Sequence, residues 1–309
     1  ADAKDADMAN GCKTAGLQKN HVEKSSGRYN PIKVYRDDML KIIDSDLVDI
    51  MLTSLSTAEI LTQQGAYANT EVTSAIRLND TTDIWVGRGA SYESQPALPF
   101  RTARLDRVKP VADLGLYAIT FYNDLQQDHR TLEAYADFRD EASAQGVRHF
   151  LEVFNPKTNV VTPGADFGSY NNDAIVRSLA AVSSHDSPLF LKAAYNGPAA
   201  TEEIASYDPG NLIFGVLGGS AGTTRDCLEL IRQAEKYGAR VALFGRKIYY
   251  ADDSVTMVKA MRRTIEEGLD SVEATKAYHA DLEKLGIRPL RELSADLELT
   301  EEVLKAGLE

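Results

Sequence analysis

Short apolar runs alternate with amphipathic segments along most of the chain. Each run is rich in aliphatic, β-branched and aromatic side chains and is bounded by Gly, Pro, Asn, Asp or Ser, which is typical of buried strands. The segments between the runs have apolar residues at helical spacing, as in HRTLEAYADFRDEASAQG over residues 129–146. The pattern predicts seven strands, over residues 48–56, 72–80, 115–124, 148–156, 188–197, 211–219 and 239–248.

Strands that alternate with helices across short connections indicate parallel βαβ units. An eighth strand is predicted near PIKVY, residues 31–35, so the expected fold is α/β, a (β/α)8 TIM barrel. We expect a polar arm over residues 1–30, the barrel over 31–254, and helices over 255–309 that close the barrel exterior or form an oligomer interface. A Gly-, Pro- and Arg-rich insertion over 80–109 follows the second strand, where binding loops and lids commonly lie.

Composition and charge exclude several classes of protein. Hydrophobic residues make up 43% of the 309 residues, and no apolar run approaches the ~20 residues that cross a bilayer. The net charge of −12 argues against a nucleic-acid partner. Cys12 and Cys227 favour a reducing, cytoplasmic setting, and no signal peptide is predicted. The five histidines have no partner at ligand spacing, so we expect no metal site.

A single lysine lies near the end of the predicted strand PLFLKAAYNG, residues 188–197. Strand alternation sends Phe190, Lys192 and Ala194 to one face, so the ammonium would lie among apolar neighbours. Complete burial lowers the pKa of a lysine by up to ~3–5 units, which leaves an amine able to attack a carbonyl. The alternative is a lysine whose long side chain reaches solvent at the strand end.

Residues on the two preceding strands could assist a nucleophilic lysine. Glu152 shares its parity with Phe150 and Phe154, so it can point inward one strand away from Lys192. A carboxylate there would transfer protons during carbinolamine formation and carbon–carbon cleavage, although a buried ion pair without chemistry is the alternative. Tyr122 lies at the end of the strand before that, where its hydroxyl could meet substrate.

Two glycine-containing loops follow the last two predicted strands. Gly218, Gly219 and Ser220 begin the run GGSAGTT before a predicted helix, and Gly245 and Arg246 follow the next strand. Glycines let backbone N–H groups approach an anion, and a helix N-terminus or a guanidinium adds favourable charge. Each loop alone could be a tight turn, but phosphate sites after the last two strands are typical of TIM barrels. The spacing does not match the dinucleotide fingerprint, and no cofactor is expected.

The run FLKAAYNGPAATEEIA, followed by VLGGSAGTTRDCLELIRQAEKYGARVALFGRKIYY, resembles a family of class I aldolases. The family includes archaeal-type fructose-bisphosphate aldolases and bacterial tagatose-bisphosphate aldolases. The resemblance implies that Lys192 forms a Schiff base. HFLEVFNP looks like the tagatose-type strand whose glutamate is the acid and base, so Glu152 inherits that role. The resemblance also implies a phosphate site formed by Gly218, Gly219, Gly245 and Arg246.

The N-terminal region departs from this family. Residues 1–35 lack the apolar opening strand whose aspartate-containing motif contacts substrate in these enzymes. RLND is similar to a KLN strand of the family, and we expect Arg77 and Asn79 from it to contribute substrate or phosphate contacts. The insertion over 80–109 could supply further contacts, through Asp83, Arg88 or Arg101.

The sequence therefore predicts a metal-independent class I aldolase. Its substrate would be a phosphorylated ketose or a related carbonyl compound, and the enzyme would be a homo-oligomer without a membrane or nucleic-acid partner. Two alternatives stay open. One is a Schiff-base acyl or ketol transferase on the same barrel, and the other is a non-catalytic barrel that binds sugar phosphates.

Overall fold

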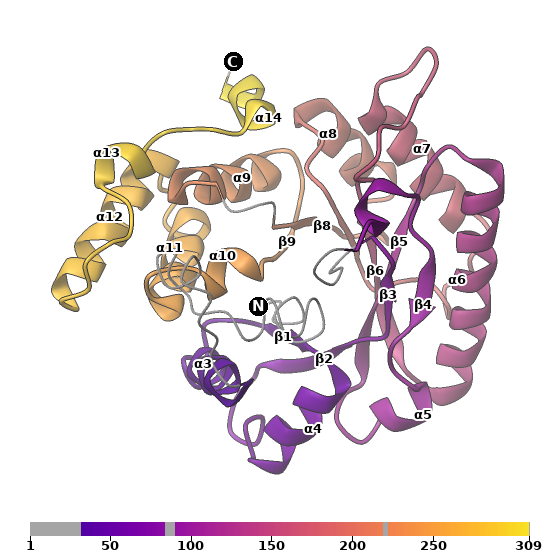
Figure 1. Ribbon diagram of the computed structural model, residues 1–309, viewed down its shortest axis with the longest axis horizontal. Helices are drawn as coiled ribbons and strands as arrows, with labels where there is room; N and C mark the ends of the chain where they lie inside the picture. The colour runs from indigo at the N-terminus through magenta and orange to yellow at the C-terminus, as the bar shows by residue number, and fades with distance from the viewer. Residues whose placement is uncertain (1–31, 84–89, 219–221, 309) are drawn as a thin grey trace.

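A curved parallel sheet of seven strands forms the centre of the molecule in the computed structural model, which describes residues 32–83, 90–218 and 222–308 (Figure 1). The strand order is β1-β2-β5-β6-β7-β8-β9. Each inner strand of this sheet therefore pairs with the strand that comes before it and the strand that comes after it in the sequence, with β3 and β4 left out. All seven predicted strands are confirmed. Their bounds are β1 Ile50–Thr53, β2 Thr73–Arg77, β5 Leu114–Thr120, β6 Arg148–Phe154, β7 Leu191–Ala193, β8 Phe214–Leu217 and β9 Val241–Leu243.

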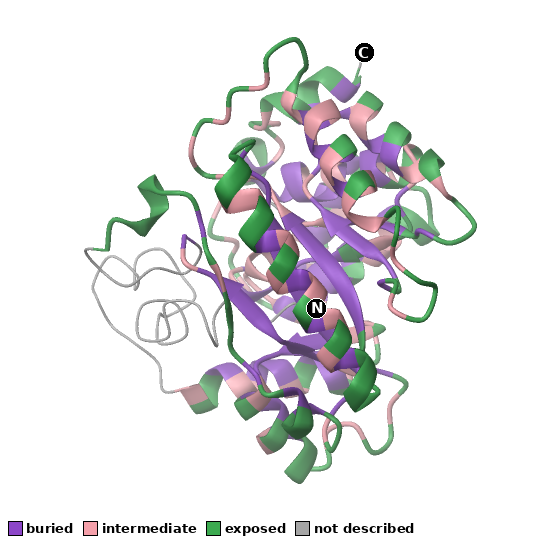
Figure 2. Ribbon diagram, turned by 90° about the vertical axis from the view of Figure 1, so that its right-hand side faces the viewer, coloured by how far each residue is buried: buried purple, intermediate pink, exposed green. Residues whose placement is uncertain are grey.

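Helices cover the outer, convex side of this sheet (Figure 1). The strands between them are buried, whereas the helices alternate buried and exposed positions (Figure 2). This is the arrangement expected when amphipathic helices pack one face on a β-barrel. The helices that follow or precede strands are α3 Ile32–Asp44, α4 Leu55–Gln63, α5 Leu105–Val108, α6 Leu125–Gln145, α7 Phe167–Leu179, α8 Pro198–Tyr207, α9 Thr224–Lys236, α10 Arg246–Tyr249 and α11 Ser254–Glu266.

Strand alternation divides the core in two. Residues of one parity pack outward against the helices and form the larger apolar cluster. Residues of the other parity point into the barrel and form a smaller cluster, in which the rings of Phe150 and Phe190 stack with centroids 4.4 Å apart. The inward cluster consists of Leu52, Ala75, Leu114, Leu116, Ala118, Phe150, Phe190 and Leu243. The interior of the barrel is therefore a packed core, as in other barrels of this type.

The predicted eighth strand is wrong, because the residues from Ile32 onward form helix α3. Its buried residues include Tyr35, Met39, Ile42 and Ile43, a spacing that fits a helix and not a strand. The ring of Tyr35 packs edge-on against Tyr249 of α10 at 4.2 Å. In the described part of the chain β9 and β1 do not pair, and a cavity of about 540 Å³ lies where residues of both strands meet α9 and α11.

The predicted insertion after β2 contains more regular structure than its composition indicates. Strands β3 Asn79–Thr81 and β4 Pro99–Arg101 form an antiparallel pair, with the short 3₁₀ helix η1 Tyr92–Ser94 between them. The Asn79 side chain donates to Ala118 O at 2.8 Å and accepts from Ala118 N at 2.7 Å. Its amide group thus takes the place of a peptide group beside β5. The chain can therefore leave the barrel after β2 while the buried N–H and C=O of Ala118 keep hydrogen-bond partners.

The C-terminal region is helical, as predicted. Helices α12 Ser271–Lys284 and α11 pack against α9, and the short helices α13 Leu293–Asp296 and α14 Glu302–Lys305 follow, ending in η2 Ala306–Leu308. Figure 1 shows this region as a layer beside α9, outside the sheet. Among the described helices, none is both long and apolar enough to cross a membrane.

Candidate active site

The register of β6 and β7 brings together the two residues that the sequence pairs as nucleophile and proton carrier. Glu152 lies directly opposite Lys192 in the parallel ladder, and both side chains point into the barrel. Lys192 Nζ lies 2.6 Å from Glu152 Oε1, and the two residues are only 2% and 1% exposed. Lys192 therefore does not reach solvent at the strand end, and the alternative of a snorkelling lysine is wrong.

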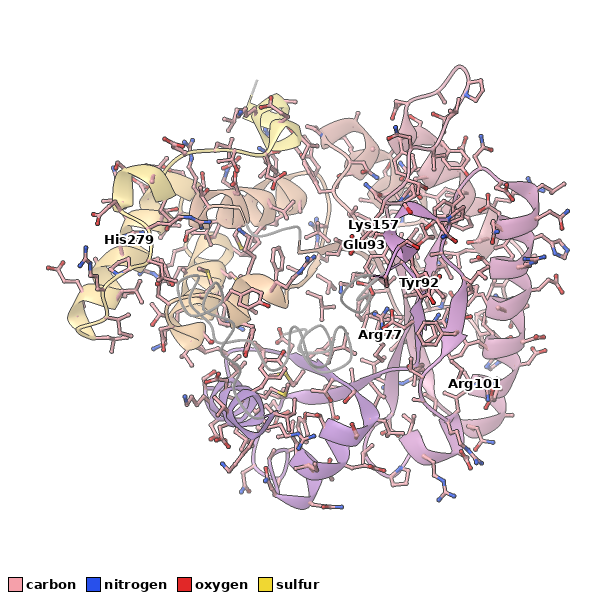
Figure 3. All side chains as sticks on the ribbon, in the orientation of Figure 1. Arg77, Tyr92, Glu93, Arg101, Lys157 and His279 are labelled. Carbon is pink, nitrogen blue, oxygen red and sulfur yellow. The ribbon has the colours of Figure 1, made fainter. Side chains whose placement is uncertain are left out.

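Arg77 at the end of β2 adds a second cation to the same carboxylate. Its Nη1 lies 3.2 Å from Glu152 Oε2, and its Nη2 lies 2.6 Å from Asp80 Oδ1. The Arg77 side chain has no exposed surface, and Figure 3 shows it inside the barrel. We call Lys192, Glu152, Arg77 and Asp80 the interior charge chain. Two cations and two carboxylates alternate along it, which offsets the high cost of burying each charge alone.

Aromatic residues lie next to the interior charge chain. The stacked pair Phe150 and Phe190 precedes Glu152 and Lys192 by two residues on each strand, so it forms an apolar layer on the side of the strand N-termini. The Arg77 guanidinium lies 5.8 Å from the ring centre of Phe154. Such surroundings keep the local dielectric low, so the charges interact more strongly than they would in water.

A second polar group lies beyond the ends of β3, β5 and β6. The Tyr122 hydroxyl donates to Asp83 Oδ2 at 3.2 Å, and Lys157 Nζ donates to the backbone oxygen of Asp83 at 2.9 Å and to Glu93 Oε1 at 3.1 Å. Lys157 and Glu93 lie close together in Figure 3. Burial raises the pKa of Asp83, although Tyr122 and Lys157 act in the opposite direction.

Tyr122 is itself nearly buried in this group. Desolvation is the main cause that raises the pKa of its phenol above the ordinary value, and the Asp83 carboxylate raises it further. Tyr122 is therefore a hydrogen-bond donor at neutral pH and a poor base. Asp83 Oδ1 and Thr120 Oγ1, both buried, make no hydrogen bond in the described structure.

The two predicted phosphate loops lie at the ends of adjacent strands. Gly218 directly follows β8, where a Cβ atom would approach the Phe244 ring to 2.7 Å, so only glycine fits without rearrangement. Gly219 and Ser220 lie outside the described residues. Gly245 is the N-cap of α10, and Arg246 is its first residue. The predicted phosphate contacts of these residues stay predictions.

The N-terminus of α9 is closed by carboxylates of the chain itself. Thr223 and Asp226 form a capping box, in which the Thr223 side chain accepts from the N–H of Asp226 and the Asp226 carboxylate accepts from the N–H of Thr223. Thr224 N donates to Asp296 Oδ1 at 2.8 Å, and Asp296 Oδ2 lies 2.8 Å from His279 Nε2. Thr300 donates to both oxygens of Asp226. We call Thr223, Asp226, Asp296 and Thr300 the α9 cap network.

Several residues of these networks cannot be found from local sequence patterns. Asn79 was expected to contact substrate, but both polar atoms of its side chain bind the backbone of Ala118. Asp80 and Asp83 are buried carboxylates that contact Arg77 and Tyr122. The sequence predicts no catalytic role for them, because the only signal is their place in the insertion after β2. No local sequence pattern indicates the role of Asp296, because it binds the N-terminus of α9 from 72 residues downstream.

Histidine provides no metal site in the described part of the chain. No group of three or more His, Cys, Asp or Glu side chains suited to a metal ion occurs among the described residues. His149 lies within β6, where it is buried. Its ring contacts the Tyr135 hydroxyl at 2.9 Å, and desolvation lowers its pKa to about 4.

Comparison with solved structures identifies the fold. No family profile and no curated protein matches the chain. A fructose-bisphosphate aldolase from Slackia heliotrinireducens aligns with a TM-score of 0.63 at 15% identity, over 91% of this chain and 85% of that one. A Schiff-base-forming fructose-1,6-bisphosphate aldolase aligns with a TM-score of 0.59 at 16% identity, over 85% and 92%. The chain has the fold of the class I aldolases.

Another solved structure agrees with this assignment. An archaeal fructose 1,6-bisphosphate aldolase aligns with a TM-score of 0.55 at 15% identity, over 76% of this chain and 85% of that one. In an aldolase-type barrel the reacting groups lie toward the carboxyl ends of the strands. Lys192 is the second of the three residues of β7, and Arg77 is the last residue of β2. The interior charge chain therefore lies in the half of the barrel where this fold places its chemistry.

Proposed function

We propose that the protein is a class I aldolase, in which the Lys192 amine forms a Schiff base with a carbonyl substrate. The observation that carries the proposal is the contact of Lys192 Nζ with Glu152 Oε1 at 2.6 Å, inside a barrel of the aldolase fold. A buried ammonium in direct contact with a carboxylate has a proton acceptor in place at all times. This is the arrangement that a nucleophilic amine requires.

Glu152 would move the protons of each step. It first takes a proton from the Lys192 ammonium, and the free amine attacks the substrate carbonyl carbon to give a carbinolamine. Glu152 then returns that proton to the carbinolamine hydroxyl, which leaves as water while the C=N bond forms. For cleavage, the carboxylate accepts the proton of the β-hydroxyl group, the carbon–carbon bond breaks, and its electron pair moves into the iminium to give an enamine.

Tyr122 would orient the substrate as a donor. Burial keeps its phenol protonated, so it is unsuited to accept a proton. Its single O–H donates to Asp83 Oδ2 at 3.2 Å, and it would exchange this acceptor for a substrate oxygen when substrate binds. We further propose that the substrate is a phosphorylated ketose or a related carbonyl compound, with its phosphate near Gly218, Gly219, Ser220, Gly245 and Arg246. The two loops follow adjacent strands β8 and β9, which pair in parallel. This is the position of the phosphate site in many TIM barrels.

Borohydride trapping tests the Schiff base directly. The protein is incubated with ketose phosphates and simpler ketones, reduced with borohydride, digested and mapped by mass spectrometry. We expect a reduced adduct on the peptide that contains Lys192, and none in Lys192→Met. Absence of an adduct on Lys192 with every carbonyl compound would exclude the mechanism.

Lys247 provides the matched control for this experiment. It is a second partly buried lysine near the barrel end, its Nζ donates to Thr223 O at 3.0 Å, and desolvation lowers its pKa. Lys247→Met should keep the adduct on Lys192. An adduct that is lost in Lys247→Met and retained in Lys192→Met would place the Schiff base on Lys247 and contradict the proposal.

A further inference from the structure

Arg77 is a buried cation that the proton steps above do not use. Its side chain is fully enclosed, and its two terminal nitrogens contact two different carboxylates, Glu152 and Asp80. A residue expected to bind substrate phosphate would present its guanidinium to the barrel mouth. Arg77 Nη1 instead lies 3.2 Å from Glu152 Oε2, whereas Lys192 Nζ lies 2.6 Å from Glu152 Oε1.

We infer that Arg77 is a positioning residue that sets the protonation state of Lys192 through Glu152, and that Asp80 adjusts this setting. The inference rests on the proposed function, in which Lys192 must lose a proton before it attacks. It assigns to Arg77 and Asp80 a role that acts on Lys192 through Glu152. The contacts that carry it are the 2.6 Å, 3.2 Å and 2.6 Å pairs of the interior charge chain.

Within the interior charge chain, the proton that can be transferred is on the Lys192 ammonium. A guanidinium keeps its proton at any pH that a folded protein experiences, so Arg77 cannot exchange with Glu152. An ammonium can lose one. Because Glu152 divides its charge between two cations, it stabilises the ammonium less than an undivided carboxylate would. The positive charge of Arg77 near Lys192 further disfavours a second cation. Both effects favour loss of the proton from Nζ while Glu152 stays ionised. The guanidinium also stabilises the Glu152 carboxylate, so Oε1 would pass the proton on to the substrate oxygen and would not keep it.

Asp80 acts in the opposite sense. It holds Arg77 Nη2 at 2.6 Å, so part of the Arg77 charge is directed away from Glu152. It also adds a negative charge that favours the ammonium form of Lys192. Arg77 and Asp80 thus have opposite effects on Lys192: the Arg77 guanidinium promotes the free amine, and the Asp80 carboxylate that contacts this guanidinium limits the effect.

The fork of the arginine suits this role better than a lysine would. Nη1 and Nη2 are fixed in one plane, so a single side chain can contact Glu152 and Asp80 in fixed relative positions. A lysine at position 77 would keep the charge but lose one of the two contacts. Arg77→Lys should therefore retain most of the electrostatic effect and Arg77→Met none of it.

The titration of Lys192 tests the inference without relying on activity. The protein is labelled with [ε-¹³C]lysine, the Lys192 resonance is assigned by its loss in Lys192→Met, and its chemical shift is followed against pH. We expect the midpoint in Arg77→Met to move up by about one pH unit or more relative to the unmodified protein. Asp80→Asn, which keeps the side-chain size, should move it down, and Arg77→Lys should remain near the original value.

Opposite shifts distinguish this role from a structural one. Variants that fold, as judged by far-ultraviolet circular dichroism and a cooperative thermal transition, are compared. Damage to packing would shift both midpoints in the same direction or neither, and either result would overturn the inference. Asp80→Asn decides alone if the Arg77 variants do not fold, because an unchanged or raised midpoint contradicts the proposed sign.

Borohydride trapping against pH separates this inference from the proposed function. If Lys192 titrates as expected in the variants but no protein forms an adduct, the electrostatic role of Arg77 stands and the aldolase proposal fails. If adducts form on Lys192 but the Arg77 and Asp80 variants leave its titration unchanged, the aldolase proposal stands and the role of Arg77 fails. If adduct formation and the titration of Lys192 show the same dependence on pH in each variant, the result supports both the aldolase proposal and the role of Arg77.

Discussion

Two buried polar networks in this molecule are each built around a carboxylate, but they differ in the groups that bind it. In the interior charge chain, the Glu152 carboxylate contacts the side-chain cations Lys192 and Arg77. In the α9 cap network, the Asp226 carboxylate accepts hydrogen bonds from the backbone N–H groups of Thr223 and Thr300 and from the Thr300 hydroxyl. Both carboxylates are almost fully buried.

The difference is in the donors. A backbone N–H does not give up its proton, so a carboxylate that it binds is held in one charge state and one position. An ammonium can transfer its proton, so the carboxylate beside Lys192 can change state without a large movement. The first kind of network stabilises a helix start, and the second kind is suited to chemistry. Burial alone does not tell them apart.

The largest expected effect is on the interior charge chain. Glu152→Ala leaves the cations Lys192 and Arg77 without their shared carboxylate inside the barrel. We expect the free energy of unfolding to fall by about 3–5 kcal/mol, the usual cost of removing one partner from a buried ion pair. Urea denaturation measures it. Lys192→Met removes a buried charge and fills its space, so we expect a smaller decrease in the free energy of unfolding. Equal decreases in Glu152→Ala and Lys192→Met would contradict the idea that uncompensated cations cause the destabilisation.

Acid titration of stability sharpens the contrast for the α9 cap network. Burial acts to raise the pKa of Asp226, but hydrogen bonds from Thr300, Thr223 and Glu301 outweigh it and hold that pKa below the ordinary value. A carboxyl with a lowered pKa in the folded state stabilises the fold above its unfolded pKa and loses this contribution as pH falls through the folded one.

Asp226→Asn should therefore be less stable at neutral pH by about 1–3 kcal/mol, since the charged acceptor of several buried donors is replaced. Its stability should also fall less steeply than that of the unmodified protein as the pH drops below the ordinary pKa of an aspartate, where Asp226 takes up its proton. Denaturant titrations at several pH values measure both. Parallel curves for the two proteins would show that Asp226 does not carry this dependence.

The helix cap itself has a smaller effect. Thr223 Oγ1 accepts from the N–H of Asp226 at 3.0 Å and donates to Glu298 O at 2.7 Å. Thr223→Ala removes both bonds and should lower the free energy of unfolding by about 1 kcal/mol. Thr223→Ser restores the hydroxyl and should recover most of the loss. Thermal denaturation of the two variants provides the comparison, and equal loss in both would mean that the methyl group, not the hydroxyl, matters.

The smallest expected effect is at an exposed pair. Arg101 on β4 contacts Glu141 on α6, and its side chain is 61% exposed (Figure 3). Surface ion pairs of this kind contribute between zero and about 1 kcal/mol. Arg101→Ala should change the unfolding midpoint little, and less still in high salt. A loss comparable with that of Glu152→Ala would remove the distinction between buried and exposed charges on which the comparison depends.

The sequence predicts those parts of the site that follow from local alternation. The parity of β6 and β7 places Glu152 and Lys192 on the inward face, and their adjacency follows from the parallel order of the strands. Arg77 was also named, but its partners were not. They depend on where β2 ends and on the Asn79 amide that turns the chain out of the barrel, neither of which has a periodic pattern.

The structure differs from the sequence prediction at two further places, and each difference has a simple physical cause. The run at residues 31–35 is too short to distinguish strand from helix, and only the apolar residues that follow it, Met39, Ile42 and Ile43, show the helical period. The N-terminus of α9 looks open to an anion in the sequence because a helix start exposes N–H groups. It is occupied by Asp296, which the fold brings back from far downstream.

The α9 cap network also sets an order of events during synthesis. Asp226 receives donors from Thr300, 74 residues later in the chain, and Thr224 binds Asp296, 72 residues later. A chain folds from its N-terminus as it is made, at about 5–20 residues per second. Strands β1 to β9 can thus assemble several seconds before the start of α9 receives its final partners, so the end of the barrel beside β8 is the last to mature.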